Sequence, residues 1–207
     1  MKKTPKVLIV EDERIAAEDI KRTLEHMGYS VIGIVSSSGD ALRETERNKP
    51  DLILMDIKLK GEMDGVELSR CIRERFDIPI VYVTAIADKL TLQRAKVTEP
   101  FGYVHKPVDE KELFISVEMA LFRSALEKEL KRNEERYRII FDGSRDAIFI
   151  SAEDARFVEV NEAAAVLTGY SKEELLKMAI PDLHEGEDLH AYKKYFHRIM
   201  QGEQITS

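Results

Sequence analysis

DLILMD, residues 51–56, is the stretch that decides the fold, because its apolar run lies between two carboxylates and directly after Pro50. A short unbroken apolar run is typical of a strand that is buried on both faces of a sheet. Asp56 would then lie at the carboxyl end of this strand, the edge at which open α/β sheets bind their ligands. We therefore expect a functional role for Asp56, and we expect Asp51, at the other end, to be a solvated turn acid.

Strand and helix patterns alternate on both sides of this stretch. Apolar runs predict strands at 6–10, 30–36, 51–56, 78–85 and 101–106, and amphipathic spacing predicts helices at about 14–27, 38–48, 66–76 and 88–97. Short links between alternating elements favour parallel strands joined by right-handed crossovers. The sequence therefore predicts an α/β fold, a doubly wound five-stranded parallel sheet of the flavodoxin-like kind with helices on both faces.

The pattern changes after Val108. Residues 109 to about 141 contain no glycine, no proline and no strand pattern, which predicts one long helix. Its second half repeats at spacings of four and three, as in the seam of a coiled coil, through Leu126, Leu130, Asn133, Tyr137 and Ile140. A single helix packed on its own domain also fits so short a repeat, so both interpretations stay open.

A smaller α+β module follows the long helix. Short strands are expected at 147–150 and 157–160, and helices at 162–170, 172–178 and roughly 187–201, with Asn161 and Ser171 as helix caps. The chain is therefore expected to divide into a domain at 1–122, a helical coiled-coil-like linker at 123–141 and a partial domain at 142–207.

The composition excludes several classes of protein. With 43% hydrophobic and 34% charged residues the chain is typical of soluble globular proteins, and its formal net charge of -7 disfavours a nucleic-acid surface. Cys71 is the only cysteine, which rules out an internal disulfide. No apolar run approaches the roughly 20 residues that span a bilayer. We expect a cytoplasmic protein with no membrane or nucleic-acid partner.

Carboxylates gather where strands end. Glu11 and Asp12 follow the first strand, and Asp56 ends the third, which should be its neighbour in a doubly wound sheet. Three carboxylates in one crevice repel one another, and a hard divalent cation would relieve that repulsion. Mg²⁺ suits such a site, because it takes oxygen ligands and keeps positions free for phosphate oxygens.

Two further strand ends add a hydroxyl and a cation to the same edge. Thr84 ends the fourth strand and Lys106 the fifth. An aspartate oxygen as nucleophile, with Mg²⁺ and a lysine to neutralise phosphoryl oxygens, makes up the chemistry of phosphoryl transfer. Each residue alone would more often be an ordinary turn acid, strand residue or solvated lysine, so the prediction depends on their joint arrangement.

These residues lie in segments that match a known family: VED at 10–12, LILMDIKLKGEMDG at 52–65, VYVTA at 81–85 and YVHKP at 103–107. Residues 5 to about 122 thereby resemble the receiver domain of two-component response regulators. The resemblance implies that Asp56 is the phosphoacceptor and that Lys106 contacts the phosphoryl group. It further implies an Mg²⁺ site formed by Glu11, Asp12, Asp56 and the main-chain carbonyl of Lys58, a switch pair formed by Thr84 and Tyr103, and a cis peptide at Lys106-Pro107.

The last part of the chain is similar to the first half of a PAS domain, through ERYRIIFDGSRDAIFI at 135–150 and FVEVNEAAAVLTGYSKEELLKM at 157–178. PAS cores close their sheet with three more strands, and the sequence stops at QITS where the first would begin. We therefore expect a partial domain that is truncated or that borrows strands from a partner. No residue pattern identifies a PAS ligand.

The expected function is that of a phosphoacceptor signalling module in a two-component phosphorelay. It would accept phosphate from a cognate histidine kinase or phosphotransfer protein and signal through a helical linker, as a homodimer, to the PAS module. It would be no enzyme beyond its own phosphoryl uptake and release. The alternative is the amino-terminal regulatory part of a hybrid sensor histidine kinase. A phosphatase of the haloacid dehalogenase type is disfavoured, because Lys58 stands where a second aspartate is needed.

Overall fold

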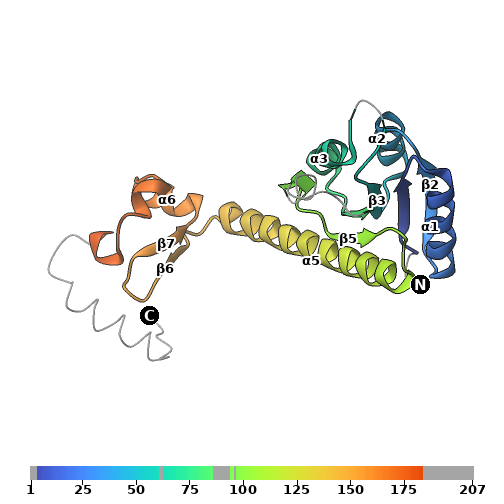
Figure 1. Cartoon of the computed structure of the whole chain (residues 1–207). Coiled ribbons are helices and arrows are strands. Elements are labelled where there is room, and N and C mark those ends of the chain that lie inside the picture. Colours follow the sequence, from blue (N-terminus) through green and yellow to red (C-terminus); the bar gives the residue numbers. More distant parts are fainter. Residues whose placement is uncertain (1–3, 61–62, 86–93, 96, 184–207) are drawn as a thin grey trace. The chain divides into compact units, whose positions relative to one another are not determined.

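The computed structural model describes residues 4–60, 63–85, 94–95 and 97–183 (Figure 1). The chain divides into two compact units, Met1–Glu129 and Leu130–Ser207. A single helix, α5 (Glu110–Gly143), contributes residues to both units. The long helix expected from residue 109 is thus confirmed, whereas the domain limits at 1–122, 123–141 and 142–207 stay a prediction.

The first unit contains a five-stranded parallel sheet. Its strands are β1 (Lys6–Val10), β2 (Ser30–Val35), β3 (Leu52–Asp56), β4 (Ile80–Thr84) and β5 (Gly102–His105). They pair in the order β2-β1-β3-β4-β5, and every pair is parallel. The predicted doubly wound sheet is therefore confirmed; the bounds of β1 match the prediction, and the ends of the other strands differ from it by at most two residues.

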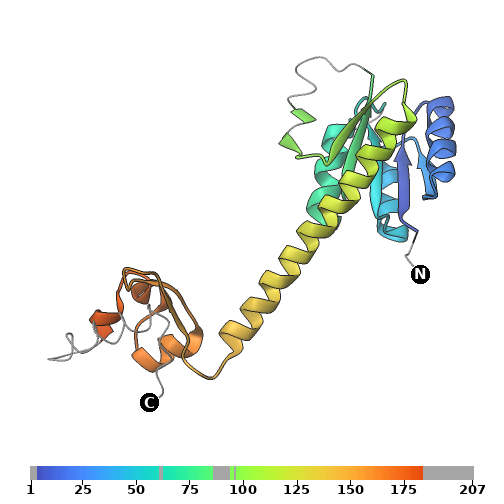
Figure 2. The same cartoon turned by 90° about the horizontal axis from the view of Figure 1, so that it is seen from below.

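Helices cover both faces of this sheet, and Figure 2 gives a second view of them. The helices α1 (Arg14–His26) and α5 pack on one face, and α2 (Ser38–Asn48) and α3 (Gly65–Phe76) pack on the other. Alternate residues of β3 supply the two cores, since Leu52 and Leu54 face α1 and α5 while Ile53 and Met55 face α2 and α3. This alternation explains why the decisive stretch is apolar throughout.

Asp51 differs from its prediction. Its carboxylate is half-buried, and Oδ2 accepts a hydrogen bond of 2.8 Å from the backbone N–H of Lys6. The backbone N–H of Asp51 in turn donates to the carbonyl of Lys6. Asp51 therefore ties the starts of β1 and β3 together, and its interpretation as a solvated turn acid was wrong.

Two predicted helices lie mostly or wholly outside the described residues. Of the helix expected at about 88–97, only Arg94, Ala95 and Val97 are described, and all three are helical. The helix expected at roughly 187–201 lies outside the described part, as does the QITS end.

The second unit pairs two antiparallel strands with short helices. Its elements after α5 are β6 (Phe149–Ser151), β7 (Phe157–Val160), α6 (Glu162–Thr168), α7 (Lys172–Leu175) and the 3-10 helix η1 (Ile180–Leu183). The caps Asn161 and Ser171 are confirmed. The helix α7 ends earlier than predicted, since the N–H groups of Lys177 and Met178 bond to carbonyls only three residues back, and the carbonyl of Met178 accepts a hydrogen bond from the N–H of Phe157, the first residue of β7.

The fully buried side chain of Asn161 joins three segments of this unit. Its amide donates to the carbonyls of Phe141 at 3.0 Å and Asp146 at 2.9 Å, and its oxygen accepts from the N–H groups of Ile148 and Ala164, each at 2.9 Å. Since these bonds hold Ile148, the first strand begins at Phe149 and not at the predicted residue 147. The end of α5 is therefore tied to the starts of β6 and α6.

No helix among the described residues is long and apolar enough to cross a bilayer.

Gly65 lies where the chain passes closest to the end of β3. It is the first residue of α3, directly after Asp64, whose side chain caps the helix together with Glu67. A Cβ atom on Gly65 would lie 2.0 Å from the backbone oxygen of Asp56. No side chain fits there unless the backbone of Asp56 moves.

We predict that Gly65→Ala lowers the free energy of unfolding by about 2–3 kcal/mol, because the clash is with rigid backbone. Urea unfolding followed by circular dichroism measures this change. Gly39→Ala is the matched control, since its Cβ would meet only the guanidinium of Arg43 at 3.6 Å. An equal effect of the two substitutions would contradict the prediction.

Candidate functional site

The carboxyl ends of β1 and β3 bring three acidic side chains together. Glu11 and Asp12 follow β1, and Asp56 is the last residue of β3, which pairs directly with β1. One carboxylate oxygen from each residue lies within 4.8 Å of the other two. The strand pattern therefore predicted this cluster correctly.

Lys106, which follows β5, places its ammonium between two of these carboxylates. Its Nζ lies 2.7 Å from Asp56 Oδ2 and 2.5 Å from Glu11 Oε2. The peptide between Lys106 and Pro107 is cis, as the family resemblance implied. Lys106 thus compensates negative charge that is largely shielded from water, since the side chains of Glu11 and Asp56 are 2% and 9% exposed.

Burial and ion pairing shift the pKa values of Glu11 and Lys106 in opposite directions. Burial raises the pKa of Glu11, although the hydrogen bond from Lys106 works against that rise. Burial alone would lower the pKa of Lys106, but its hydrogen bonds to Asp56 and Glu11 outweigh this effect and raise the pKa above its usual value. Lys106 therefore stays positively charged at neutral pH.

A second lysine reaches the third carboxylate. The Nζ of Lys60, in the loop after β3, lies 3.0 Å from Asp12 Oδ2. The hydrogen bond to Asp12 is the main cause of the raised pKa of Lys60. The sequence analysis did not identify Lys60 as a site residue. The only sign of its role in the sequence is its position, four residues after Asp56.

Both carboxylate oxygens of Asp56 are engaged. The backbone N–H of Lys58 donates to Oδ1 at 2.9 Å, and Lys106 donates to Oδ2. Lys58 therefore meets Asp56 through its N–H, and the role of its carbonyl as a metal ligand stays a prediction.

The acidic cluster suits Mg²⁺ by donor type and by size. Mg²⁺ binds oxygens at about 2.0–2.1 Å in an octahedron, so that opposite ligands lie about 4 Å apart. The three oxygens, within 4.8 Å of one another, need only small side-chain rotations to reach this spacing. The receiver domains that residues 5 to about 122 resemble generally bind Mg²⁺ at an acidic pocket, and Glu11, Asp12 and Asp56 supply such a pocket here.

Thr84 and Tyr103 lie on the neighbouring strands. Thr84, the buried last residue of β4, donates its hydroxyl proton to the carbonyl of Ala85 at 2.7 Å. The hydroxyl of Tyr103, in β5, is buried and has no hydrogen-bond partner among the described residues. Its ring lies 5.7 Å from that of Tyr82, whose hydroxyl bonds to Thr98 at 2.9 Å. Among the described residues, the side chain of Tyr103 is therefore held by packing alone, unlike that of Tyr82.

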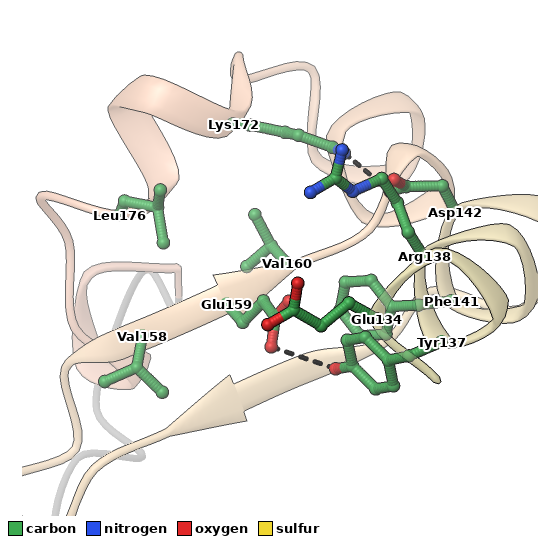
Figure 3. A pocket seen from close by; sticks show the side chains of 10 residues that line it. All are labelled: Glu134, Tyr137, Arg138, Phe141, Asp142, Val158, Glu159, Val160, Lys172 and Leu176. Atoms are coloured by element: carbon green, nitrogen blue, oxygen red, sulfur yellow. Dashed lines mark hydrogen bonds and ion pairs between the residues drawn. The ribbon is translucent and has the colours of Figure 1, made fainter. Parts of the chain in front are cut away.

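The second unit has a hollow of about 440 Å³, which Figure 3 shows from close by. The end of α5, β7 and the segment around α7 line it. The hydroxyl of Tyr137 donates to Glu159 at 2.9 Å, and Lys172 pairs with Asp142 at 2.6 Å. Its apolar lining, including Val158 and Leu176, is partly exposed. This mixture of paired charges and open apolar surface identifies no ligand class, so the PAS ligand stays unknown.

Comparison with known families separates the same two parts of the chain. Residues 7–118 match the family model of the response regulator receiver domain, and residues 135–207 match that of the PAS fold. The first match contains every residue of the carboxylate and lysine cluster.

Relatives of known name align with the first part. The chain is 32% identical over 135 residues to the transcriptional regulatory protein PdtaR of Mycobacterium tuberculosis, which covers 63% of the chain and 65% of PdtaR. It is 36% identical over 124 residues to the TorCAD operon transcriptional regulatory protein TorR of Escherichia coli, covering 59% of the chain and 53% of TorR. The chain thus spans less than two thirds of the length of these relatives.

Solved structures show the same fold. The signal receiver domain of a modulated diguanylate cyclase from Desulfovibrio desulfuricans has 42% identity and a TM-score of 0.58, over 60% of this chain and 99% of that one. The N-terminal domain of a response regulator/sensory box/GGDEF 3-domain protein from Carboxydothermus hydrogenoformans has 35% identity and a TM-score of 0.54, over 59% and 98%.

We predict that Lys106→Met lowers the free energy of unfolding by about 2–4 kcal/mol near pH 8, because it leaves two buried carboxylates without their cation. Without Lys106 the pKa of Glu11 would rise further, so the folded state would bind more protons than the unfolded state, and stability would fall as pH rises. Urea unfolding should show a smaller loss near pH 5 than near pH 8, and added Mg²⁺ should restore part of it. A loss that is independent of pH, or an equal loss in the exposed control Lys128→Met, would contradict this account.

Proposed function

The chain belongs to the response regulator receiver family, with a PAS fold after the receiver, and we propose that Asp56 is its phosphoacceptor in a two-component phosphorelay. The observation that carries this proposal is the position of Asp56, beside Glu11 and Asp12 and within 2.7 Å of Lys106 Nζ. A structural carboxylate would need one counterion, whereas this site combines acids, a partly buried lysine and a nearby hydroxyl.

The proposed reaction moves one phosphoryl group. A carboxylate oxygen of Asp56 attacks phosphorus, and the bond from phosphorus to the donor's leaving atom breaks as the acyl phosphate forms. Mg²⁺, held by Glu11, Asp12 and Asp56, would neutralise charge on the phosphoryl oxygens. Lys106 Nζ already contacts Asp56 Oδ2 and would turn to a phosphoryl oxygen. The N–H of Lys58 keeps the other oxygen oriented.

The switch would follow from the new charge. A phosphoryl group adds about -1.5 to -2 in charge, and the Thr84 hydroxyl would leave the Ala85 carbonyl to bond it. Tyr103 would move into the vacated space, and the proposal is supported by its hydroxyl, which has no hydrogen-bond partner in the described part of the chain. The proposed output surface comprises β5 and the start of α5, together with residues 88–97, of which only 94, 95 and 97 are described. To reverse a 1:99 equilibrium, phosphorylation must favour the active state by about 5.5 kcal/mol.

The proposed donor is a cognate histidine kinase or phosphotransfer protein. An open, largely apolar hollow of about 550 Å³ lies beside the site, between α1 and the loop that carries Lys106 and Pro107. Ile15, 75% exposed on α1, lines this hollow. Apolar surface next to a reactive group suits docking of a protein donor, which a small-molecule donor would not require.

Output is proposed to pass along α5 to the PAS module in a homodimer. The seam residues Leu126, Leu130, Tyr137 and Ile140 are all about half exposed or more, and the polar position Asn133 is exposed as well. Exposed leucines at coiled-coil spacing on one helix favour pairing with the same helix of a second copy.

The alternative is that residues 1–207 form the amino-terminal regulatory part of a hybrid sensor histidine kinase. One structural relative is named for a response regulator, a sensory box and a GGDEF domain, which supports a receiver that precedes other modules. We propose no enzymatic activity for this chain beyond phosphoryl uptake and release. Autophosphorylation by this chain from ATP would therefore contradict the proposed function.

We predict that acetyl phosphate with Mg²⁺ adds one phosphoryl group to the wild-type protein and none to Asp56→Asn. Intact-mass spectrometry and Phos-tag electrophoresis measure the adduct. Asp51→Asn, at the opposite end of the same strand, should be labelled like the wild type. Labelling of Asp56→Asn at the wild-type level would refute the phosphoacceptor assignment.

For the homodimer, we predict that Leu126→Glu combined with Leu130→Glu weakens self-association at least tenfold, because it puts charge into the apolar seam. Sedimentation velocity with and without beryllofluoride measures the association. Lys131→Glu introduces the same side chain beside the seam and should have little effect. A wild-type monomer in both conditions would count against the dimer.

A further inference from the structure

The two lysines of the site differ in how firmly they are held. Lys106 contacts two carboxylates, and its side chain is 18% exposed. Lys60 contacts only Asp12 among the described residues, and its side chain is 90% exposed. Exposed ion pairs of long side chains contribute little to stability and exchange readily with water. Lys106 is therefore a fixed part of the site, whereas Lys60 can leave it.

From this difference we infer that Lys60 is an exchangeable counterion that occupies Asp12 until Mg²⁺ displaces it, so that Lys60 lowers the affinity of the site for Mg²⁺. This inference rests on the proposed function, because it takes Asp12 as a metal ligand. It assigns a role to a loop residue that lies outside the carboxylate cluster itself.

The geometry makes the ammonium and the metal competitors. Lys60 Nζ lies 3.0 Å from Asp12 Oδ2, on the one carboxylate of the cluster that Lys106 does not contact. Mg²⁺ would bind carboxylate oxygens at about 2.1 Å, so a lysine held at Asp12 would lie within a few ångströms of a divalent charge. That repulsion must be relieved, and the exposed lysine is the partner that can move into water.

Charge balance points in the same direction. Three carboxylates and two lysines leave the site with one negative charge, whereas without Lys60 it would carry two. Mg²⁺ is attracted more strongly to the more negative site, and it no longer has to displace a cation. Removal of the Lys60 charge should therefore tighten Mg²⁺ binding, by about three- to tenfold after screening by solvent and salt.

The opposite role is that Lys60 supports the phosphorylated site as an additional cation. In that case its removal would weaken phosphorylation by acetyl phosphate at every Mg²⁺ concentration and would leave metal affinity unchanged. The two roles therefore differ in a binding measurement that involves no phosphoryl transfer.

The experiment titrates the full chain with Mg²⁺ by calorimetry and with Mn²⁺ by the loss of the free-ion electron paramagnetic resonance signal. Mn²⁺ is a suitable probe, because it favours the same oxygen ligands. Lys60→Met removes the charge and keeps an unbranched side chain, and Lys60→Arg keeps the charge. Lys128→Met removes a charge at the opposite edge of the sheet, where Lys128 lines a hollow with Pro5 and Asp51.

We expect Lys60→Met to bind both ions about three- to tenfold more tightly than the wild type, and Lys60→Arg and Lys128→Met to stay within about twofold of it. The gain should vanish when Lys60→Met is combined with Asp12→Asn. Equal affinities of the wild type and Lys60→Met, or no metal binding by either, would overturn the inference. Labelling of Asp56 by acetyl phosphate is measured separately, so a failed metal titration leaves the phosphoacceptor assignment intact. Wild-type protein that is not labelled would refute that assignment whatever the titration shows.

Discussion

Mutual repulsion of three carboxylates within 4.8 Å of one another is the constraint on which the first unit depends. The sheet creates the repulsion, because β1 and β3 pair side by side and end on acidic residues. The sheet also relieves it, because β5 delivers Lys106 to the same edge. Since β4 lies between β3 and β5, the compensating cation must cross one strand to reach Asp56, and the length of a lysine side chain permits this.

The strand pattern predicted most of this arrangement. Glu11, Asp56 and Lys106 each end or directly follow an apolar run, so the position of the runs alone brings them to one edge. Lys60 could not be predicted in this way, because a loop conformation and not a strand register brings its side chain to Asp12. Asp51 was misjudged for a related reason, since nothing in its neighbourhood in the sequence reveals that the N–H of Lys6 lies opposite.

The second unit shows the same division between local and tertiary information. The helix caps at Asn161 and Ser171 were predictable, because capping joins residues only three positions apart. The bonds from Asn161 to Phe141 and Asp146 span 20 and 15 residues, and only the folded unit reveals them. The start of β6 shifted from its predicted position for this reason, since a side chain occupies the backbone N–H of Ile148 that strand pairing would otherwise use.

Asn161 also couples motion of the end of α5 to the rest of the second unit. Its side-chain NH₂ group donates to the carbonyl of Phe141 in the last turn of the helix. Its side-chain oxygen accepts from the N–H of Ile148, just before β6, and from the N–H of Ala164 in α6. These bonds are 2.9–3.0 Å long and at least partly buried, so a twist of the helix about its own axis must carry both elements round with it. The hydrogen bond from Tyr137 to Glu159 and the ion pair of Lys172 with Asp142 join the same end of α5 to β7 and α7, so this end of the helix and the second unit move together.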